Sequence, residues 1–478
     1  MRHRLPYPPS CSAGKGNVGY PVTKHTFADI EQKVLRCSRG EEYFDAYVNY
    51  IKNATFWKSF RDRYKSELPI WYPETRKESP ETMEGALSPA VCPAGTVSRR
   101  SVHKLWVTAT NANEDDRIGT GLKSMIQAGT GTVFVGADVD SQEQWIAALC
   151  GDASRAERLP LADRVPGCSP FSNMMLAGSK SDGSDLHSVV AKDLKIGRND
   201  AKTLNYARLY GAGEKNAIEH LVKCGTKEKE AEQKARELFR ITKGAKHSFR
   251  RLHPLANALF EEFLSEGENS DKEGYLCIGG RYYLLAWESA RCATTLDFED
   301  WVVDRILKEK GIEESGEKQN EMRSKTIRAL YEDIGRTIML YSGGYESDTF
   351  NFLEVASLSD DLRTPVLGCK LSTSLSPLPE DTPGAELFAL KYKRSVINWI
   401  VQSSAVDYLH LMLVYIRWLC GRYDIDARFS LSIHDEVRYV VNEVDAERFA
   451  LALMYANLFV RAMMSTKLGI QQLPMVGH

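Results

Sequence analysis

The chain has 478 residues, of which 43% are hydrophobic, and this length allows more than one domain or one large core with an inserted subdomain. Its formal net charge of −2 excludes a protein that binds nucleic acid through a strongly basic surface alone, so such binding needs local basic patches such as Arg99-Arg100 and the predicted helix that begins at Arg198. Ten cysteines without a C-x2-C pair indicate neither a zinc site nor a disulfide framework, and no apolar run reaches the length of a membrane-spanning helix.

The first predicted element with chemical interest is a short strand at residues 132–137, an apolar, β-rich run that follows Gly131. It places Asp138 at its end, and the stretch at 144–149 then reads as a helix. An acid at the exit of a buried strand is placed like a catalytic group, because the sheet fixes its backbone while its side chain reaches the rim. The alternative is that Asp138 or Asp140 only caps the following helix.

A helix is predicted from Arg198 to Tyr210, and the glycines that follow end it. Arg198, Lys202, Tyr206 and Tyr210 recur at every fourth position, so they share one slowly rotating face. A triphosphate can lie against the two cations near the helix N-terminus, and a base can pack against the two rings. The alternative is a solvated cationic stripe followed by tyrosines of the core.

Residues 309–345 are rich in charge and compatible with helix, which predicts an inserted surface segment. Further along, Arg394, Asn398 and Gln402 recur at every fourth position of an otherwise apolar helix. Burying an amide without a partner costs about 1 to 3 kcal/mol, so we expect these side chains to meet an internal partner or a ligand. A polar layer satisfied by neighbouring backbone is the alternative.

Two predicted strands near the end of the chain, at 428–433 and 437–441, flank a turn that holds Asp435 and Glu436. Alternating apolar residues define one face of each strand: Phe429, Leu431 and Ile433 on the first, and Val437, Tyr439 and Val441 on the second. The turn therefore presents a pair of acids on a rigid tip, which suits the binding of a divalent metal. Ordinary turn chemistry at His434-Asp435 is the alternative.

Asp138 and Asp435 are both strand-end acids, but they lie nearly 300 residues apart in the sequence, which leaves their convergence open. If they meet, they support two-metal chemistry, in which metals about 4 Å apart activate an attacking oxygen and stabilise a leaving one. A substrate that carries phosphates also needs cations, and the face that begins at Arg198 supplies them.

These three segments resemble the motifs of the family A DNA polymerases. Residues 138–143 (DVDSQE) resemble motif A, residues 198–211 (R-x3-K-x3-Y-x3-YG) resemble the fingers helix of motif B, and residues 434–436 (HDE) resemble motif C. Longer strings at 136–143, 363–368 and 398–413 resemble the mitochondrial, or gamma, branch of that family. The resemblance covers roughly residues 17–474 and is weakest across 153–180 and 309–345.

The resemblance implies an α+β right-hand polymerase fold, with an antiparallel-sheet palm, largely helical fingers and a thumb that is mostly missing. We expect four segments: 1–63 as a thumb remnant and its connection to the palm, 64–158 as the first part of the palm, 159–394 as fingers with an insert at about 309–345, and 395–478 as the second part of the palm.

The implied reaction adds deoxynucleotides to a primer 3′-hydroxyl, templated by DNA and assisted by two Mg²⁺ ions, in the replication of mitochondrial DNA. The implied partners are primer-template DNA, deoxynucleoside triphosphates and a processivity accessory subunit, with no membrane, and the implied location is the mitochondrion. Two alternatives stay open: a truncated fragment that binds primer-template without turnover, and a family A repair polymerase outside mitochondria. A metal-dependent nuclease shares the paired acids but has no need of the face that begins at Arg198.

At the metal site, the resemblance implies that Asp138 and Asp435 bridge two Mg²⁺ ions, with the backbone carbonyl of Val139 as a further ligand. Glu436 then supports the primer end, and Glu143 excludes a ribose hydroxyl by packing beside C2′. Taken alone, Glu143 reads as a solvated helix acid.

At the nucleotide site, the resemblance implies that three side chains hold the triphosphate and neutralise charge on the leaving pyrophosphate: His187, Arg198 and Lys202. Tyr206 faces the incoming nucleotide, where a tyrosine tolerates dideoxynucleotides, and Tyr210 stacks against the template base or the nascent pair. Ala207 departs from the glycine that is usual there, which leaves its effect on catalysis open. Taken alone, His187 reads as a surface histidine at a helix start.

Primer-template contacts are implied for Arg100, Asn111, Asn113, Arg394, Asn398, Gln402 and His434. Side chains of this kind reach the minor groove, whose purine N3 and pyrimidine O2 acceptors are shared by all correct pairs. They can therefore sense pair geometry without reading sequence.

The first 28 residues contain four basic residues and no acid, a composition similar to that of a mitochondrial transit peptide. Asn17-Val18-Gly19 nevertheless resembles interior family sequence, and the family runs on past the equivalent of Pro474. Family members also carry an exonuclease and a spacer before this point. We therefore expect the chain to be a fragment or a partial gene model.

Overall fold

The computed structural model describes residues 27, 29–30, 34–67, 70–71, 85–86, 96–101, 126–139, 141–267, 269, 272–286, 293–311, 316–332, 337–359, 361–372 and 385–471, with the backbone alone for 62–67, 70–71, 85, 317, 385–394 and 433. It divides into two compact units, Met1–Ala90 with His103–Lys123, and Val91–Val102 with Ser124–His478. The four segments expected from the resemblance stay predictions.

The smaller unit contains one long helix, α2 (Glu41–Glu67), and a short antiparallel pair, β1 (Ile70–Trp71) with β2 (Gly85–Ala86). Helix α2 buries little of its surface: Val48 is buried, whereas several aromatic side chains, such as Trp57, are exposed.

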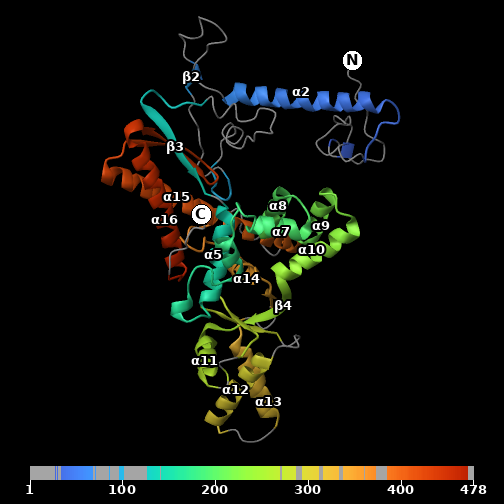
Figure 1. Cartoon of the computed structure of the whole chain (residues 1–478). Coiled ribbons are helices and arrows are strands. Elements are labelled where there is room, and N and C mark those ends of the chain that lie inside the picture. The colour runs from blue at the N-terminus through green and yellow to red at the C-terminus, as the bar shows by residue number, and fades with distance from the viewer. Residues whose placement is uncertain are drawn as a thin grey trace, which may run out of the picture. The chain divides into compact units, whose positions relative to one another are not determined.

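The larger unit contains a three-stranded antiparallel sheet of order β3-β9-β8. Its strands are β3 (Thr132–Asp138), β8 (Ala427–Ile433) and β9 (Glu436–Asn442). Figure 1 shows helices α15 (Ala385–Tyr423) and α16 (Ala446–Lys467) beside this sheet. Apolar side chains of β9 are fully buried in one core with these helices and with α5 (Gln142–Ala156). The sheet thus has a packed face, and β3 is one of its edges.

Two details of this sheet differ from the prediction. A β-bulge between Phe429 and Leu431 breaks the alternation of β8, so Leu431 is fully buried while Phe429 is 47% exposed. Strand β3 was expected to be buried, but its side chains are half-buried or exposed because it lies at the sheet edge.

A layer of helices follows β3 and forms a second core. Its members are α5, α6 (Pro170–Ala177), α7 (Leu186–Leu194), α8 (Arg198–Leu209), α9 (Glu214–Lys223), α10 (Glu228–Thr242), α14 (Ser347–Ala356) and part of α15, with the short 3-10 turn η2 (Leu161–Asp163) between α5 and α6. The predicted helix at 198–210 is confirmed almost to the residue, and Gly211 ends it in a left-handed conformation (φ 85°).

A four-stranded antiparallel sheet of order β5-β6-β4-β7 completes the larger unit. Its strands are β4 (Gly244–Arg251), β5 (Tyr275–Cys277), β6 (Tyr282–Leu285) and β7 (Ile338–Gly343), and the neighbouring helices are α11 (Pro254–Ser265), α12 (Ala293–Glu309) and α13 (Glu317–Leu330). The expectation of largely helical fingers did not include this sheet. The segment 309–345 is likewise not wholly helical, because β7 lies in it and its Leu340 is fully buried.

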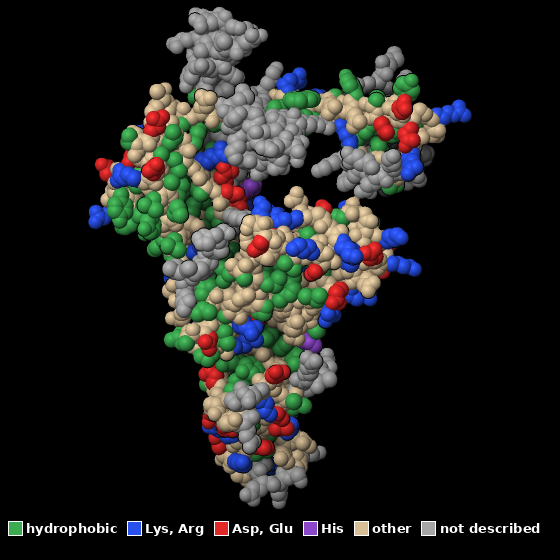
Figure 2. Space-filling view, viewed as in Figure 1, with side chains coloured by type: hydrophobic (Ala, Val, Ile, Leu, Met, Phe, Trp, Pro, Cys, Tyr) green, Lys and Arg blue, Asp and Glu red, His purple; other side chains and the backbone are tan. Residues whose placement is uncertain are grey.

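The last helix corrects the expectation that no apolar run is long enough to span a membrane. Residues Glu443–Lys467, which comprise the 3-10 turn η4 (Glu443–Asp445) and α16, are long and apolar enough by length and composition. The inner face of α16 packs in the core through residues such as Phe449 and Val460, so the fold itself accounts for part of this apolar character. Its outer face, with Met454 69% exposed, contributes to the hydrophobic surface over α15 and α16 in Figure 2.

Candidate functional site

The pairing of β3 with β9 brings the two strand-end acids together. Asp138 lies opposite Glu436 in the register, and the Val139 N–H donates a hydrogen bond of 3.3 Å to the Asp435 carbonyl. A Cβ atom at Gly136 would lie 2.5 Å from the Val437 carbonyl oxygen, so glycine permits this close approach of the strands. The convergence that the sequence left open is therefore present in the structure.

Negative charge is crowded at this point. Burial, followed by the carboxylates of Asp138 and Glu143, raises the pKa of Asp435 to about 6. Next to it, His434 adopts a left-handed backbone conformation (φ 56°) in the hairpin turn. Burial and the Arg100 guanidinium lower the pKa of the His434 imidazole. Such a concentration of carboxylates at a strand end is the environment that a divalent cation neutralises.

The two acids of the hairpin have different surroundings. The Glu436 carboxylate accepts hydrogen bonds from the Arg438 guanidinium, at 2.5 Å from Nε and 2.5 Å from Nη2. Asp435 lies in the turn between β8 and β9, and the charged groups that act on its carboxyl group are Asp138, Glu143 and Arg100. The structure thus distinguishes a paired glutamate from an aspartate that sits among carboxylates.

Glu143 lies in the first turn of α5, two residues after Ser141, which has a left-handed conformation (φ 51°). Its side chain is buried and forms an ion pair with Arg100. The reading of Glu143 as a solvated helix acid is therefore wrong. Arg100 was expected to contact DNA, and in this structure its guanidinium is held by Glu143.

The residues expected to bind a triphosphate lie together on α7 and α8. The Arg198 guanidinium pairs with the Asp185 carboxylate at 2.8 Å, and the His187 ring stacks on Tyr206 with 6.1 Å between centroids. Lys202 is exposed, and its ammonium lies 5.9 Å from the centroid of the Tyr206 ring. His187 is only 3% exposed, so the surface reading of this histidine is wrong.

A cavity of about 320 Å³ lies beside these residues. Its lining includes Ser141 at the start of α5, His187 and Asp185 at the start of α7, and Arg198 at the start of α8. Three helix beginnings therefore converge on one hollow, together with a cation and an imidazole. Helix N-termini favour anions, so the hollow is chemically suited to phosphate.

Two tyrosines of α8 lie between two groups of residues. The first group, on α7 and α8, is His187, Arg198 and Lys202, here called the helical wall. The second is Asp138, Asp435 and Glu436, here called the acid tip. Burial and then the Glu143 carboxylate raise the pKa of both Tyr206 and Tyr210 above the usual range, and Asp435 contributes in the same direction. Tyr206 hydrogen-bonds the Ser141 side chain, and Tyr210 hydrogen-bonds Gln402. The aromatic half of the predicted face is thus within electrostatic reach of the acid tip.

The polar stripe on α15 is only partly described. Gln402 is half-buried and meets Tyr210, whereas the Asn398 amide oxygen is buried without a hydrogen-bond donor among the described residues. The side chain of Arg394, and all of Asn111 and Asn113, lie outside what the structure describes. A ligand donor for Asn398 remains the prediction.

A buried network behind α8 was missed by the sequence reasoning. The Asn205 amide meets His187 Nδ1 at 3.1 Å, Arg208 donates to the Asn205 oxygen at 3.2 Å, and Arg208 pairs with Glu346 at 2.7 Å. Arg208 and Asn205 lie on the inward side of the predicted helix, which is the one signal that the sequence offered. Glu346 is 138 positions from Arg208 and carried none.

A second missed interaction anchors the segment before β3. Arg99 Nη2 pairs with the buried Asp407 of α15 at 2.7 Å and donates to the Ser403 carbonyl at 3.3 Å. With Arg100 held by Glu143 and Arg198 by Asp185, the basic patches expected to bind DNA are each engaged with an acid of the protein. Any phosphate that binds there competes with these carboxylates.

Known proteins provide the family. No family model matches the chain. It is 38% identical over 98% of its length to "DNA polymerase subunit gamma-1" of Gallus gallus, 35% identical over 98% to the protein of that name from Xenopus laevis, and 36% identical over 96% to "DNA polymerase subunit gamma-1, mitochondrial" of Drosophila melanogaster. It spans 65% of the Gallus sequence and 35% of each of the other two.

A structure described as "POL domain of Pol1 from M. smegmatis complex with DNA primer-template and dNTP" matches 95% of this chain and 54% of its own, with a TM-score of 0.47 and 14% identity. A TM-score below 0.5 does not establish a common fold, so the family assignment rests on the sequence relatives. By that similarity, the chain belongs to the DNA polymerase gamma family and corresponds to a part of its longer members.

Proposed function

We propose that this chain performs DNA-templated DNA synthesis, adding deoxynucleotides to a primer 3′-hydroxyl in the replication of mitochondrial DNA. The observation that carries the proposal is the β3–β9 register, which places Asp138 beside the hairpin of Asp435 and Glu436. The polymerase names of the relatives support the reaction, and the word mitochondrial in the name of the Drosophila protein supports the location.

The donor atoms at the acid tip fit Mg²⁺. The carboxylates of Asp138 and Asp435 and the Val139 carbonyl are hard oxygen donors, the type that Mg²⁺ prefers. The mutual repulsion that raises the pKa of Asp435 is relieved by a cation between the acids. These atoms would hold two Mg²⁺ ions, whose charge would activate the primer 3′-hydroxyl and stabilise the leaving pyrophosphate.

The surrounding residues take the roles that their positions allow. Arg198, Lys202 and His187 bind the triphosphate, and the cavity at the beginnings of α7 and α8 receives part of it. Glu143, fixed by Arg100, excludes a 2′-hydroxyl. Glu436 supports the primer end.

The DNA contacts follow from the same arrangement. Tyr206 faces the incoming nucleotide, and Tyr210 packs on the template base or the nascent pair. The unpartnered Asn398 oxygen and the neighbouring Gln402 supply the minor-groove contacts, together with Arg100, Asn111, Asn113, Arg394 and His434.

On this proposal, the three-stranded sheet with its helices is the palm, and the helical layer from α6 to α10 belongs to the fingers. The segment 1–63 is a thumb remnant. A processivity subunit is a further proposed partner.

Primer extension tests the reaction directly. We expect Asp138→Ala and Asp435→Ala each to lower extension by roughly a thousandfold or more, because each removes a metal ligand used in the transition state. The thermal midpoint should not fall, because each substitution also relieves repulsion between the acids. Asp426→Ala is the matched control, since this exposed acid lies at the far end of the same hairpin. Substantial extension by either acid variant would overturn the proposal.

A fragment that binds primer-template without turnover is the competing function. It predicts a gel shift with primer-template but no extension by this chain, together with extension by a longer chain of the same protein. Extension by this chain alone would exclude it. Fractionation of cells that express the full-length protein separates a mitochondrial replicase from a repair polymerase located elsewhere.

A further inference from the structure

Three side chains with metal-ligating atoms meet on the side of α8 away from the nucleotide face. Asp200 lies in the first turn of α8, and His220 and Cys224 lie four residues apart at the end of α9, so they share one face of that helix. One ligand atom from each lies within 4.8 Å of the other two. Across the described residues, no other trio of His, Cys, Asp or Glu meets this spacing.

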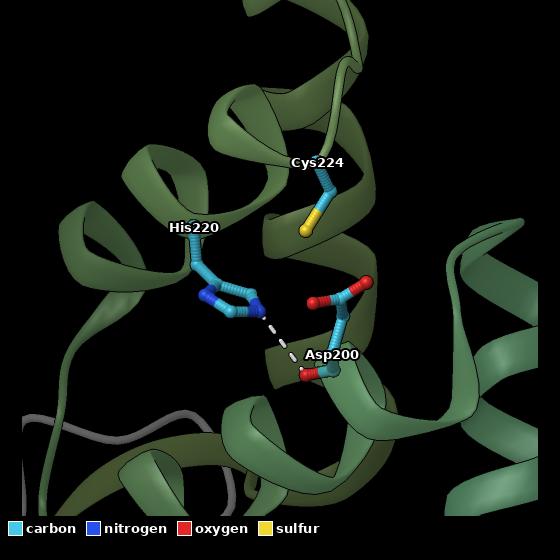
Figure 3. Close-up of side chains that lie close together, drawn as sticks. All are labelled: Asp200, His220 and Cys224. Atoms are coloured by element: carbon cyan, nitrogen blue, oxygen red, sulfur yellow. Dashed lines mark hydrogen bonds between the residues drawn. The ribbon is translucent and has the colours of Figure 1, made fainter. Parts of the chain in front are cut away.

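The three side chains are oriented as a metal site requires. Figure 3 shows the Cys224 sulfur, the His220 ring and the Asp200 carboxylate turned toward one another between the two helices. The His220 Nε2 atom lies 3.1 Å from the Asp200 carbonyl oxygen, so it is the imidazole nitrogen on the inner side. His220 and Cys224 are half-buried and Asp200 is exposed, which leaves the site open to solvent on one side.

The ligand set selects the metal. Thiolate, imidazole and carboxylate together are the ligands of Zn²⁺, at about 2.3 Å for sulfur and about 2.0 to 2.2 Å for nitrogen and oxygen. In a tetrahedron with these bond lengths, neighbouring ligand atoms lie roughly 3.5 Å apart. The ligand atoms here lie within 4.8 Å of one another, so small side-chain rotations bring them to the spacing of a zinc site without a movement of either helix.

We propose that Asp200, His220 and Cys224 bind one Zn²⁺ ion, with water in the fourth position, and that this ion links α8 to α9. The site escaped the sequence analysis because only two of its ligands are close in sequence and they are not paired cysteines. Arg198 and Lys202 lie two residues to either side of Asp200, so they project from the opposite side of α8. The ion thus leaves the proposed nucleotide face clear while holding the helix that carries it.

Binding exchanges one hydrogen bond for metal bonds. Without metal, His220 Nε2–H donates to the Asp200 carbonyl, and the Cys224 thiol lies within 4.8 Å of a ligand atom of each of the other two residues. When zinc binds, the thiol proton leaves to solvent and bonds form from the metal to Sγ, Nε2 and a carboxylate oxygen. The imidazole then carries its proton on Nδ1 and stays neutral. Oxidation states do not change.

The test uses the full chain without DNA or nucleotide, in excess Mg²⁺ to occupy the acids at Asp138 and Asp435. We expect one equivalent of Zn²⁺ to bind in a titration against a chelating dye. Co²⁺ in its place should give a thiolate charge-transfer band and a tetrahedral visible spectrum. Zinc should also protect Cys224, identified by peptide mapping, from alkylation.

Ligand variants and matched controls make the assignment specific. We expect Cys224→Ser and Asp200→Asn each to weaken zinc binding by about 100-fold or more, since loss of even an outer-shell partner costs 10- to 100-fold. His220→Gln should do the same while keeping a donor for the Asp200 carbonyl. Cys37→Ser and Asp138→Ala should bind zinc as the parent does, because neither removes a proposed ligand.

Thermal unfolding followed by circular dichroism guards against a folding artefact. Zinc should raise the midpoint of the parent but not that of Asp200→Asn, and the two should match without zinc. Absence of a stoichiometric cobalt band, or equal zinc binding by Cys224→Ser, would leave only the hydrogen-bonded cluster and overturn the proposal. Because no step measures synthesis, the result is independent of the proposed polymerase function.

Discussion

The acid tip at the ends of β3 and β9 and the helical wall on α7 and α8 are held in place by different interactions. At the tip, main-chain pairing sets the geometry: Asp138 and Asp435 meet because β3 and β9 are in register. At the wall, side chains set it: His187 is fixed through Asn205 and a buried Arg208–Glu346 ion pair. Strand register tolerates surface substitutions, whereas a buried charge pair fails when either partner is lost.

Removing one charge from the buried ion pair behind α8 has the largest expected effect. Arg208 is 1% and Glu346 6% exposed at the side chain, so Glu346→Gln leaves a buried guanidinium uncompensated. We expect the free energy of unfolding to fall by about 3 to 5 kcal/mol, measured by urea denaturation.

Two further variants decide whether the buried charge is the cause. The double variant Arg208→Met with Glu346→Leu should recover most of the loss, because no lone charge then remains. Arg305→Met, at an exposed ion pair with Glu262, should leave the midpoint nearly unchanged. An equal loss in the double variant would mean that packing, and not charge, supports the wall.

Lys243, a second buried charge next to this network, makes the stability of the fold depend on pH. Burial is the main cause that lowers the pKa of Lys243 from 10.5 to about 8, while Glu346 opposes this shift and Arg208 adds to it. Between about pH 8 and 10.5 the unfolded chain therefore binds more protons than the folded one, and stability rises with pH across that window.

The shift corresponds to at most about 3 kcal/mol, and Lys243→Met should remove this part of the pH dependence. Denaturant midpoints of parent and variant, compared from pH 7 to 10.5, measure the difference. Lys229→Met, at an exposed position of α10, is the matched control. Parallel curves for the parent and Lys243→Met would contradict the expectation.

The geometry of the acid tip depends on the close backbone approach of β3 and β9, which a substitution of Gly136 disturbs. A methyl group at Gly136 would lie 2.5 Å from the Val437 carbonyl oxygen, so Gly136→Ala pushes β3 away from β9 and moves Asp138. We expect a loss of about 1 to 3 kcal/mol in thermal or urea unfolding, together with a fall in primer extension. At Gly129 the nearest atom would be 3.8 Å away, so Gly129→Ala should change neither.

The same difference between main-chain pairing and side-chain contacts explains which features could be predicted from the sequence. Strands β3, β8 and β9 and helix α8 follow from local periodicity and turn residues, and the motif spacing pointed to the acids on them. The bulge after Phe429 and the strand β7 depend on packing partners that a local pattern does not contain. Glu346 and Asp407 are ordinary acids in the sequence, and only the fold places the buried Arg208 against the first and the half-buried Arg99 against the second.

The smallest predicted effect tests whether Asn205 acts by positioning His187 for nucleotide binding and not by affecting the catalytic step. Asn205→Ala removes the amide that meets His187 Nδ1, while the acids at the tip are untouched. A hydrogen bond of this kind is worth about 1 kcal/mol, so we expect the KM for the nucleotide to rise about five- to tenfold while kcat stays near that of the parent. Thr203→Ala, on the exposed side of α8, should leave KM unchanged. A fall in kcat with KM constant would instead mean that the network acts on the acid tip, and the two regions would then be one mechanical unit.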